Sequence, residues 1–157
     1  MSATLPPRWF VRSAWRTHKL LLRLTRDRLL RPPGPGRCGF LRLHTVGRRT
    51  GRPHAVVLCY IEDGDRLCTL AMNGWAPADP AWWLNVQAHP ATTVDLADGS
   101  HAVTAHRAVG AERDRLWAAL HTYEGYGDLD AHAAARGRET AVVVLTKRAD
   151  APAPGGR

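Results

Sequence analysis

Two Asp-Gly dipeptides, Asp63-Gly64 and Asp98-Gly99, constrain the fold of this chain most strongly, because β-type segments flank each of them. An Asp-Gly pair between two such segments is typical of a two-residue hairpin turn. The strands that these turns imply are residues 54–62 and 66–72 around the first, and residues 92–97 and 100–108 around the second. The chain is therefore expected to build antiparallel sheet.

The rest of the chain adds two strands and two helices. Residues 40–46 alternate in polarity, and residues 141–147 form a β-branched run. A short helix is expected over residues 80–89, and a second begins at about Ala111, while residues 123–140 are predicted to be irregular. An open sheet would expose the apolar last strand at an edge. We therefore expect a closed antiparallel barrel, in a mainly β (α+β) fold with flanking helices.

All of the excess positive charge lies in the first 37 residues. They contain nine Lys or Arg and one acid, so they carry the whole formal net charge of +8, and the remaining residues sum to zero. Basic residues three or four apart predict an amphipathic helix over residues 8–31, which two prolines then end. We expect an N-terminal basic helix with a Pro/Gly linker (1–39), a barrel domain (40–147) and a disordered tail (148–157).

This charge pattern bears on partners and location. A nucleic-acid-binding domain spreads basic residues over its folded face, so no nucleic-acid partner is expected. The basic helix suits peripheral contact of residues 8–31 with an anionic membrane, or packing on the barrel or on a partner subunit. No apolar run reaches the ~20 residues of a membrane span, and no signal-peptide pattern is present. The expected location is cytoplasmic. If the basic helix binds lipid, the protein is expected at the inner face of the membrane.

The cysteines and histidines predict neither a disulfide nor a metal site. Cys38, Cys59 and Cys68 lack metal-ligand spacing, and the eight histidines show no i,i+4 pairing. If Asp63-Gly64 is the two-residue turn, Cys59 falls opposite Cys68, which makes a disulfide geometrically conceivable. Free buried thiols in a reducing compartment are favoured.

The loop between the first two strands is the best candidate site. The sequence has no GxSxG, Walker, GxGxxG or HExxH motif, so demanding chemistry would have to come from a cofactor. Glycine lets the backbone approach an anion, and guanidinium groups bind phosphate or carboxylate through paired hydrogen bonds. A solvated turn with arginines for solubility is the alternative. The loop residues are Gly47, Arg48, Arg49, Thr50, Gly51 and Arg52.

The segment from Ala71 to Asn85 is a second candidate. Met72 and Asn73 leave a strand, and the adjacent Trp82 and Trp83 follow on a helix. One indole can pack on the barrel while the other flanks a planar ring system, or both belong to the core.

The two segments together carry a family pattern. LHTVGRRTGRPH (43–54) and AMNGWAPADPAWWLNVQAHPATTV (71–94) resemble the deazaflavin-dependent nitroreductase family, and the similarity extends from about residue 40 to residue 145. The resemblance implies a six-stranded split β-barrel, here preceded by the N-terminal amphipathic helix. It implies coenzyme F420 as the cofactor, with FMN less favoured. Split barrels in related families are often dimers, so a homodimer is one expectation and the oligomeric state stays open.

The same resemblance assigns cofactor binding to residue groups of this sequence. The arginine-rich loop would hold the phosphate and oligoglutamate tail, and the later segments would border the ring and its side chain. His54 stands where members commonly have arginine. The cofactor-binding residues expected on this basis are His44, Thr45, Arg48, Arg49, Thr50, Gly51, Arg52, Pro53, His54, Leu70, Ala71, Met72, Asn73, Ala81, Trp82, Trp83, Leu84 and Asn85.

The resemblance also bears on the acceptor. Tyr123 and Tyr126 match family aromatics of the substrate pocket, so we predict that Tyr126, and second Tyr123, polarise the acceptor oxygen; packing tyrosines are the alternative. Met72 replaces a serine, and Leu129 a tyrosine, of members that reduce bicyclic nitroimidazoles. The predicted activity is hydride transfer from reduced deazaflavin to a small-molecule acceptor of quinone, enone or nitro type. A non-catalytic F420, FMN or haem binding or carrier protein is the alternative.

Overall fold

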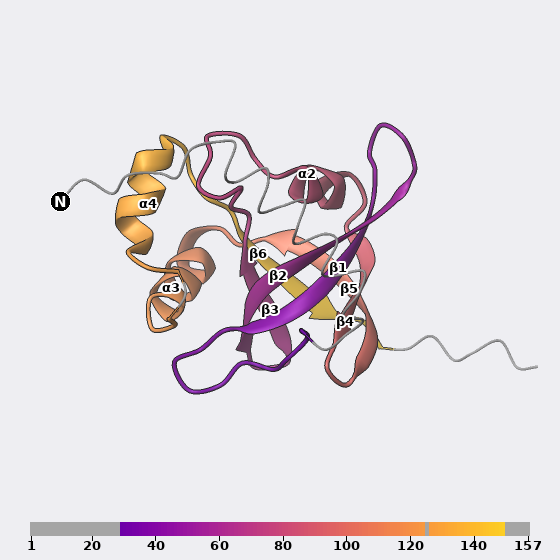
Figure 1. The fold of residues 1–157 in the computed structure, drawn as a ribbon, viewed down its shortest axis with the longest axis horizontal. Coiled ribbons are helices and arrows are strands. Elements are labelled where there is room, and N and C mark those ends of the chain that lie inside the picture. Colours follow the sequence, from indigo (N-terminus) through magenta and orange to yellow (C-terminus); the bar gives the residue numbers. More distant parts are fainter. Residues whose placement is uncertain (1–28, 125, 150–157) are drawn as a thin grey trace, which may run out of the picture.

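A computed structural model describes residues 29–124 and 126–149, and its centre is a closed six-stranded barrel (Figure 1). Every strand pair is antiparallel, in the order β1-β2-β3-β6-β5-β4. β6 pairs with β3 and β5, so the apolar last strand has no free edge, as expected. The strands are β1 (Gly39–Val46), β2 (Pro53–Asp63), β3 (Arg66–Leu70), β4 (Ala91–Leu96), β5 (Gly99–Arg107) and β6 (Val142–Lys147).

Both hairpins form, but their register differs from the prediction. Asp63 faces Arg66, so the turn residues are Gly64 and Asp65 rather than Asp63-Gly64. Gly64 takes the positive φ of 64°, and the Asp63 carboxylate accepts from Arg66 across the turn. In the second hairpin Leu96 faces Gly99.

The shifted register separates the two cysteines that a turn at Asp63-Gly64 would have placed opposite each other. Cys68 lies opposite Ile61, not Cys59. All three cysteines are free thiols, as favoured, and burial raises the pKa of Cys59 and of Cys68 to about 12. The pairing that an Asp63-Gly64 turn would have given does not form, because the turn lies one residue later and Asp63 and Arg66 form an ion pair across it.

Two apolar clusters lie on opposite faces of the sheet. The inner cluster fills the barrel with side chains such as Leu43, Val94 and Leu145, which alternate along the strands. The outer cluster covers the other face of β2, β3 and β6, where Cys68 and Val144 pack against helices. β6 is therefore buried on both faces, which explains its unbroken β-branched run.

Three helices complete the described part: α2 (Ala81–Ala88), α3 (Gly110–Leu120) and α4 (Leu129–Arg136). α2 covers one end of the barrel, and α3 and α4 lie together at its side (Figure 1). α4 contradicts the irregular stretch predicted for residues 123–140. Asp128 caps its start by accepting from Ala131, and Gly137 ends it with φ 73°. The Tyr and Gly residues before it obscured these signals.

Residues 8–28 of the helix predicted over residues 8–31 lie outside the described residues. Residues 29–31, the last three of the predicted helix, are described and are not helical. Arg31 pairs with Phe40 in a β-bridge, and Gly34 pairs with Arg37. Within the Pro/Gly stretch predicted as a linker, the chain forms a tight hairpin that leads into β1. No helix in the described residues is long and apolar enough to cross a membrane. The predicted tail lies outside them except for Arg148 and Ala149.

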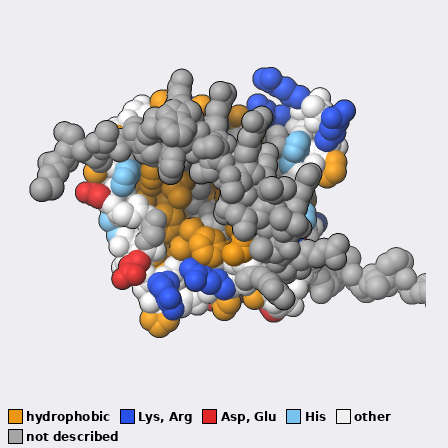
Figure 2. Space-filling model, viewed as in Figure 1, with side chains coloured by type: hydrophobic (Ala, Val, Ile, Leu, Met, Phe, Trp, Pro, Cys, Tyr) orange, Lys and Arg blue, Asp and Glu red, His pale blue; other side chains and the backbone are white. Residues whose placement is uncertain are grey.

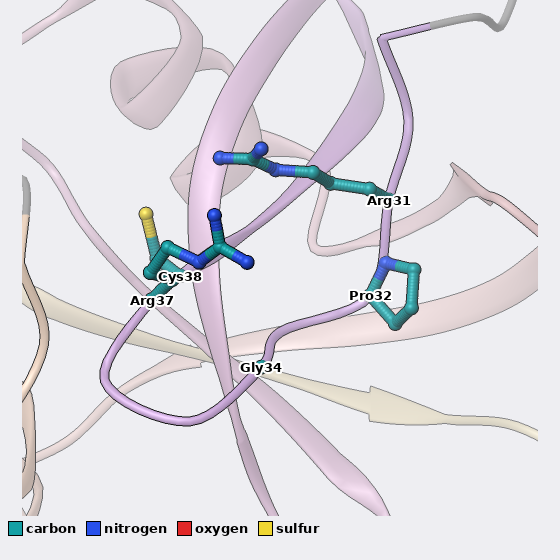
Figure 3. A pocket seen from close by; sticks show the side chains of 5 residues that line it. All are labelled: Arg31, Pro32, Gly34, Arg37 and Cys38. Atoms are coloured by element: carbon teal, nitrogen blue, oxygen red, sulfur yellow. The ribbon is translucent and has the colours of Figure 1, made fainter.

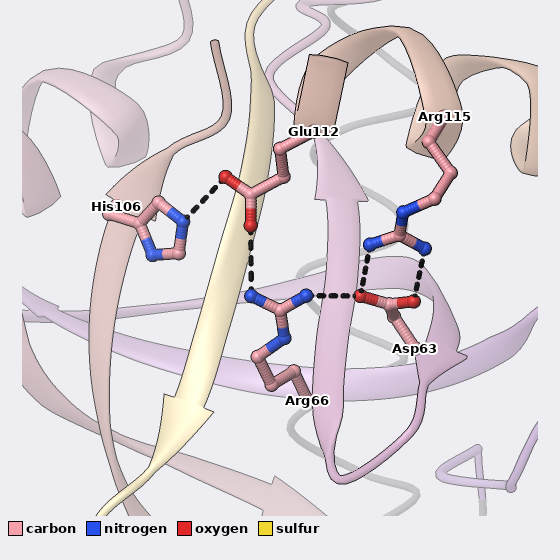
Figure 4. A network of polar contacts seen from close by, with 5 residues as sticks. All are labelled: Asp63, Arg66, His106, Glu112 and Arg115. Atoms are coloured by element: carbon pink, nitrogen blue, oxygen red, sulfur yellow. Dashed lines mark hydrogen bonds and ion pairs between the residues drawn. The ribbon is translucent and has the colours of Figure 1, made fainter. Parts of the chain in front are cut away.

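An ion network joins α3 to the β2–β3 turn (Figure 4). Arg66 donates to Asp63 and to Glu112, and Arg115 donates to both Asp63 oxygens at 2.6 and 3.0 Å. His106 also bonds Glu112. Hydrogen bonds from Arg115 and Arg66 lower the pKa of Asp63 to about 2. This network orients α3 over the outer cluster.

Candidate cofactor and acceptor site

The β1–β2 loop is held by its own backbone. The Gly47 N–H donates to the Arg52 carbonyl and the Gly51 N–H to the Gly47 carbonyl, both at 2.8 Å. Gly51 has φ 65°, and a Cβ on Gly47 would come within 2.5 Å of the Thr50 hydroxyl oxygen. The N–H groups of these glycines are thus used within the loop, which leaves guanidinium groups as its main donors to a ligand.

Arg48, Arg49 and Arg52 are exposed on this loop, and Figure 2 shows Lys and Arg side chains gathered where the β1–β2 hairpin projects from the body. Within residues 29–124 and 126–149, none of the three makes an ion pair with a carboxylate. By contrast, Arg66, Arg115 and Arg136 all pair with acids. Three neighbouring cations that lack a carboxylate partner in the described part of the chain suit a multiply charged anion.

α2 carries the second predicted group and contacts the loop directly. Asn85 is buried, and its Oδ1 accepts from the Arg48 backbone at 3.1 Å and from its guanidinium at 3.4 Å. Trp82 and Trp83 are also buried, edge to face, in the inner cluster. Stacking of one indole on a ligand ring stays a prediction, while packing of both in the core is what the structure shows.

The remaining predicted cofactor residues differ in exposure. Thr45, Leu70 and Ala71 are buried. Those open to a ligand at least in part are His44, Thr50, Gly51, Pro53, His54, Met72, Asn73, Ala81 and Leu84. The loop and α2 lie together, whereas Met72 packs against the outer cluster.

His44 has a partner that sequence reasoning missed. Its Nε2 donates to the Asp95 carboxylate at 2.7 Å, and Ser100 donates to the other oxygen. Arg42 lies 3.6 Å from the same group. Burial alone would raise the pKa of Asp95, but hydrogen bonds from Ser100 and His44 lower it below its ordinary value. The bond fixes the imidazole at the rim of the loop.

Arg136 is the other residue that the sequence did not reveal. Its fully buried guanidinium donates to the carbonyls of Ala76 and Ala78 and to Asp79 and Thr140. It thereby ties the segment between β3 and α2 to α4. In the sequence, Arg136 stands out only as an arginine just before the glycine that ends a helix. Its contacts could not be predicted, because only the fold brings residues about 60 positions apart together.

Tyr126 and Tyr123 lie with the outer cluster. Tyr126 is buried, and its hydroxyl has no hydrogen-bond partner in the described part of the chain. Burial, and next the thiols of Cys59, Cys38 and Cys68, raise its pKa well above the ordinary value. The group therefore stays protonated and available as a donor. Tyr123, Met72 and Trp75 are partly buried against the same cluster, and Leu129 is buried within it.

The family follows from a match over the barrel. Residues 35–147 match the family model described as F420H(2)-dependent quinone reductase, which is more than half of the 157 residues. The chain belongs to the F420H(2)-dependent quinone reductase family. As a member it is an oxidoreductase, and its cofactor is coenzyme F420. This confirms the F420-dependent resemblance drawn from residues 43–94.

Two solved structures share the fold of this chain. One, described as an F420-H2 dependent reductase (FDR-A), is 26% identical with a TM-score of 0.58, over 68% of this chain and 92% of that one. Another, described as a domain-swapped dimer, is 25% identical with a TM-score of 0.59, over 89% and 99% of the two chains. The predicted barrel is thus the architecture of a solved F420-H2 dependent reductase.

The residues present fit this cofactor. F420 carries a phosphate and carboxylates, and the β1–β2 loop offers three guanidinium groups that lack carboxylate partners among the described residues. The tight Gly47 turn keeps these groups at one tip of the barrel. No cluster of His, Cys, Asp or Glu in the described ranges could hold a metal ion.

Proposed function

We propose that this reductase transfers hydride to a quinone or enone acceptor, with nitro-type acceptors less favoured because Met72 and Leu129 are apolar. The observation that carries the proposal is the arginine loop fastened to α2 through Asn85. Arg48, Arg49, Arg52 and Thr50 would hold the acidic tail of the cofactor. When bound, the reduced deazaflavin supplies a hydride from carbon 5 of its ring.

The Tyr126 hydroxyl would bind the acceptor oxygen. A buried hydroxyl without a partner costs about 1–3 kcal/mol, which an acceptor carbonyl would recover. Donation from Tyr126 would also stabilise the negative charge that develops on that oxygen. Tyr123, partly buried beside it against the outer cluster, is the second candidate.

Titration of the purified protein with F420 and with FMN tests cofactor binding, and reduction of menadione by reduced F420 tests activity. We expect tighter binding of F420 and turnover that Tyr126→Phe slows by about tenfold or more. Tyr60→Phe, which alters a buried tyrosine of the barrel interior, is the matched control. F420 binding without turnover of any quinone would favour a carrier protein, and equal rates for Tyr126→Phe would remove this hydroxyl from the mechanism.

Assembly and membrane contact are the remaining parts of the proposal. The relative described as a domain-swapped dimer favours a homodimer, which light scattering after gel filtration would detect. The charge pattern of residues 8–31 suits peripheral contact with anionic lipid, and packing on the barrel or on a partner subunit is the alternative. Flotation with anionic liposomes, with and without residues 1–28, would measure it, and equal flotation would contradict it.

A further inference from the structure

The hairpin that precedes β1 holds two arginines in fixed positions. Arg31 and Phe40 exchange backbone hydrogen bonds at 3.3 and 2.9 Å, and Gly34 and Arg37 do so at 2.9 and 3.0 Å. A Cβ on Gly39 would come within 2.6 Å of the Arg31 carbonyl, so the two arms pack without space for a side chain. The hairpin is therefore preorganised.

Between the arms lies a pocket of about 60 Å³. Arg31 and Arg37 extend their guanidinium groups to the same side of it, where the buried Cys38 thiol also points (Figure 3). Neither arginine pairs with a carboxylate in residues 29–124 or 126–149; Arg31 lies over the Phe40 ring at 4.8 Å. Two neighbouring cations repel each other, and an oxyanion bound between them would remove that repulsion.

The pocket adjoins the outer cluster that holds the Tyr126 hydroxyl. The Glu124 N–H donates to the Gly36 carbonyl at 2.7 Å, which fastens the chain just before Tyr126 to the hairpin. Cys38 lines the pocket and is buried in the same outer cluster as Tyr126. The hairpin that carries the arginine pair is therefore joined to the surroundings of Tyr126 by Cys38 and by the Glu124–Gly36 hydrogen bond.

We propose that Arg31 and Arg37 bind an oxyanion substituent, a carboxylate or sulfonate, of an acceptor whose reducible carbonyl lies at Tyr126. This inference rests on the proposed function and narrows its substrate class to acidic quinones. A guanidinium pair binds such a group through hydrogen bonds as well as charge, so it discriminates against a neutral quinone of the same shape.

Calorimetric titration without F420 tests the pocket. The probes are anthraquinone-2-sulfonate and its neutral analogue 2-(hydroxymethyl)anthraquinone, neither of which has an open quinone carbon for thiol addition. We expect the sulfonate to bind more tightly, and Arg31→Gln or Arg37→Gln to weaken it about fivefold each while sparing the neutral analogue. Arg148→Gln, another exposed arginine without a described carboxylate partner, is the matched control.

The outcomes separate this inference from the proposed function. The inference would be overturned if the wild-type protein bound the two anthraquinones with equal affinity. It would also be overturned if the Gln variants lost affinity for both compounds equally. Weaker binding of F420 in Arg31→Gln and Arg37→Gln would also overturn it, because the pocket would then serve the cofactor. Absence of F420 binding to the wild-type protein would contradict the proposed function. The calorimetric comparison of the two anthraquinones could still be made, because it needs no cofactor. Arg31→Lys and Arg37→Lys should restore part of the sulfonate affinity.

Discussion

The backbone N–H of Arg48 donates to the buried Oδ1 of Asn85 across 3.1 Å. This bond joins the loop, whose three arginines have no carboxylate partner among the described residues, to the helix at the end of the barrel. Because Asn85 also accepts from the Arg48 guanidinium at 3.4 Å, it influences both the path of the loop and the direction of one cation. The anion site thus depends on a neutral side chain.

Asn85→Asp should weaken F420 binding more than Asn85→Ala. Aspartate can still accept from Arg48, but its charge would neutralise that arginine and repel the anionic tail, whereas alanine only frees the loop. We expect F420 affinity to fall about tenfold in Asn85→Asp and about threefold in Asn85→Ala, as measured by fluorescence titration. Gln87→Ala, at an exposed position of the same helix, is the control. Unchanged affinity of Asn85→Asp would place the tail elsewhere.

Arg48→Ala combined with Arg49→Ala should weaken F420 binding about thirtyfold at low salt, since each exposed guanidinium contributes about 1 kcal/mol. The affinity of the wild-type protein should fall as salt rises, and that of the double variant should change little. Titrations at two ionic strengths, with Arg148→Ala as the control, measure this. Equal affinities at low salt would contradict the assignment of the loop.

Arg136→Leu should destabilise the fold by about 3 kcal/mol, because it leaves Asp79 and two carbonyls without a buried donor. Arg138→Leu is the matched control, since Arg138 contacts the same Asp79 from a half-exposed position and should cost less than about 1 kcal/mol. Urea unfolding gives both values. Similar losses would show that the buried guanidinium has no special role.

Stability should fall as the pH drops from about 4 to about 2. Hydrogen bonds from Arg115 and Arg66 lower the pKa of Asp63 from its usual 3.8 to about 2, so the charged carboxylate stabilises the folded state above that range. Protonation of Asp63 as the pH falls through its folded-state pKa lowers the free energy of unfolding by about 1–2 kcal/mol. Urea midpoints for Asp63→Asn should depend less on pH than those of the wild type. Asp65→Asn, in the same turn, should retain the wild-type dependence.

The barrel was predictable because its signals are local. Glycine in the turns, β-branched strands and the Pro80 helix start all act within a few residues, and they led to the right strands and closure. The register was not predictable, since the Asp63–Arg66 ion pair competes with the turn preference of Asp-Gly. α4 was missed although Asp128 and Gly137 are ordinary caps, because its short apolar pattern follows Tyr- and Gly-rich chain.

The sequence by itself determined the strands, the arginine loop and the family pattern, because each depends on residue types close together along the chain. Tertiary structure alone decided that Asn85 holds Arg48, that Arg136 fastens the segment before α2, and that Tyr126 is buried in the cluster that holds Cys38 and Cys68. These contacts join residues far apart in sequence. Their partners are chosen by barrel closure and helix packing, which no local propensity encodes.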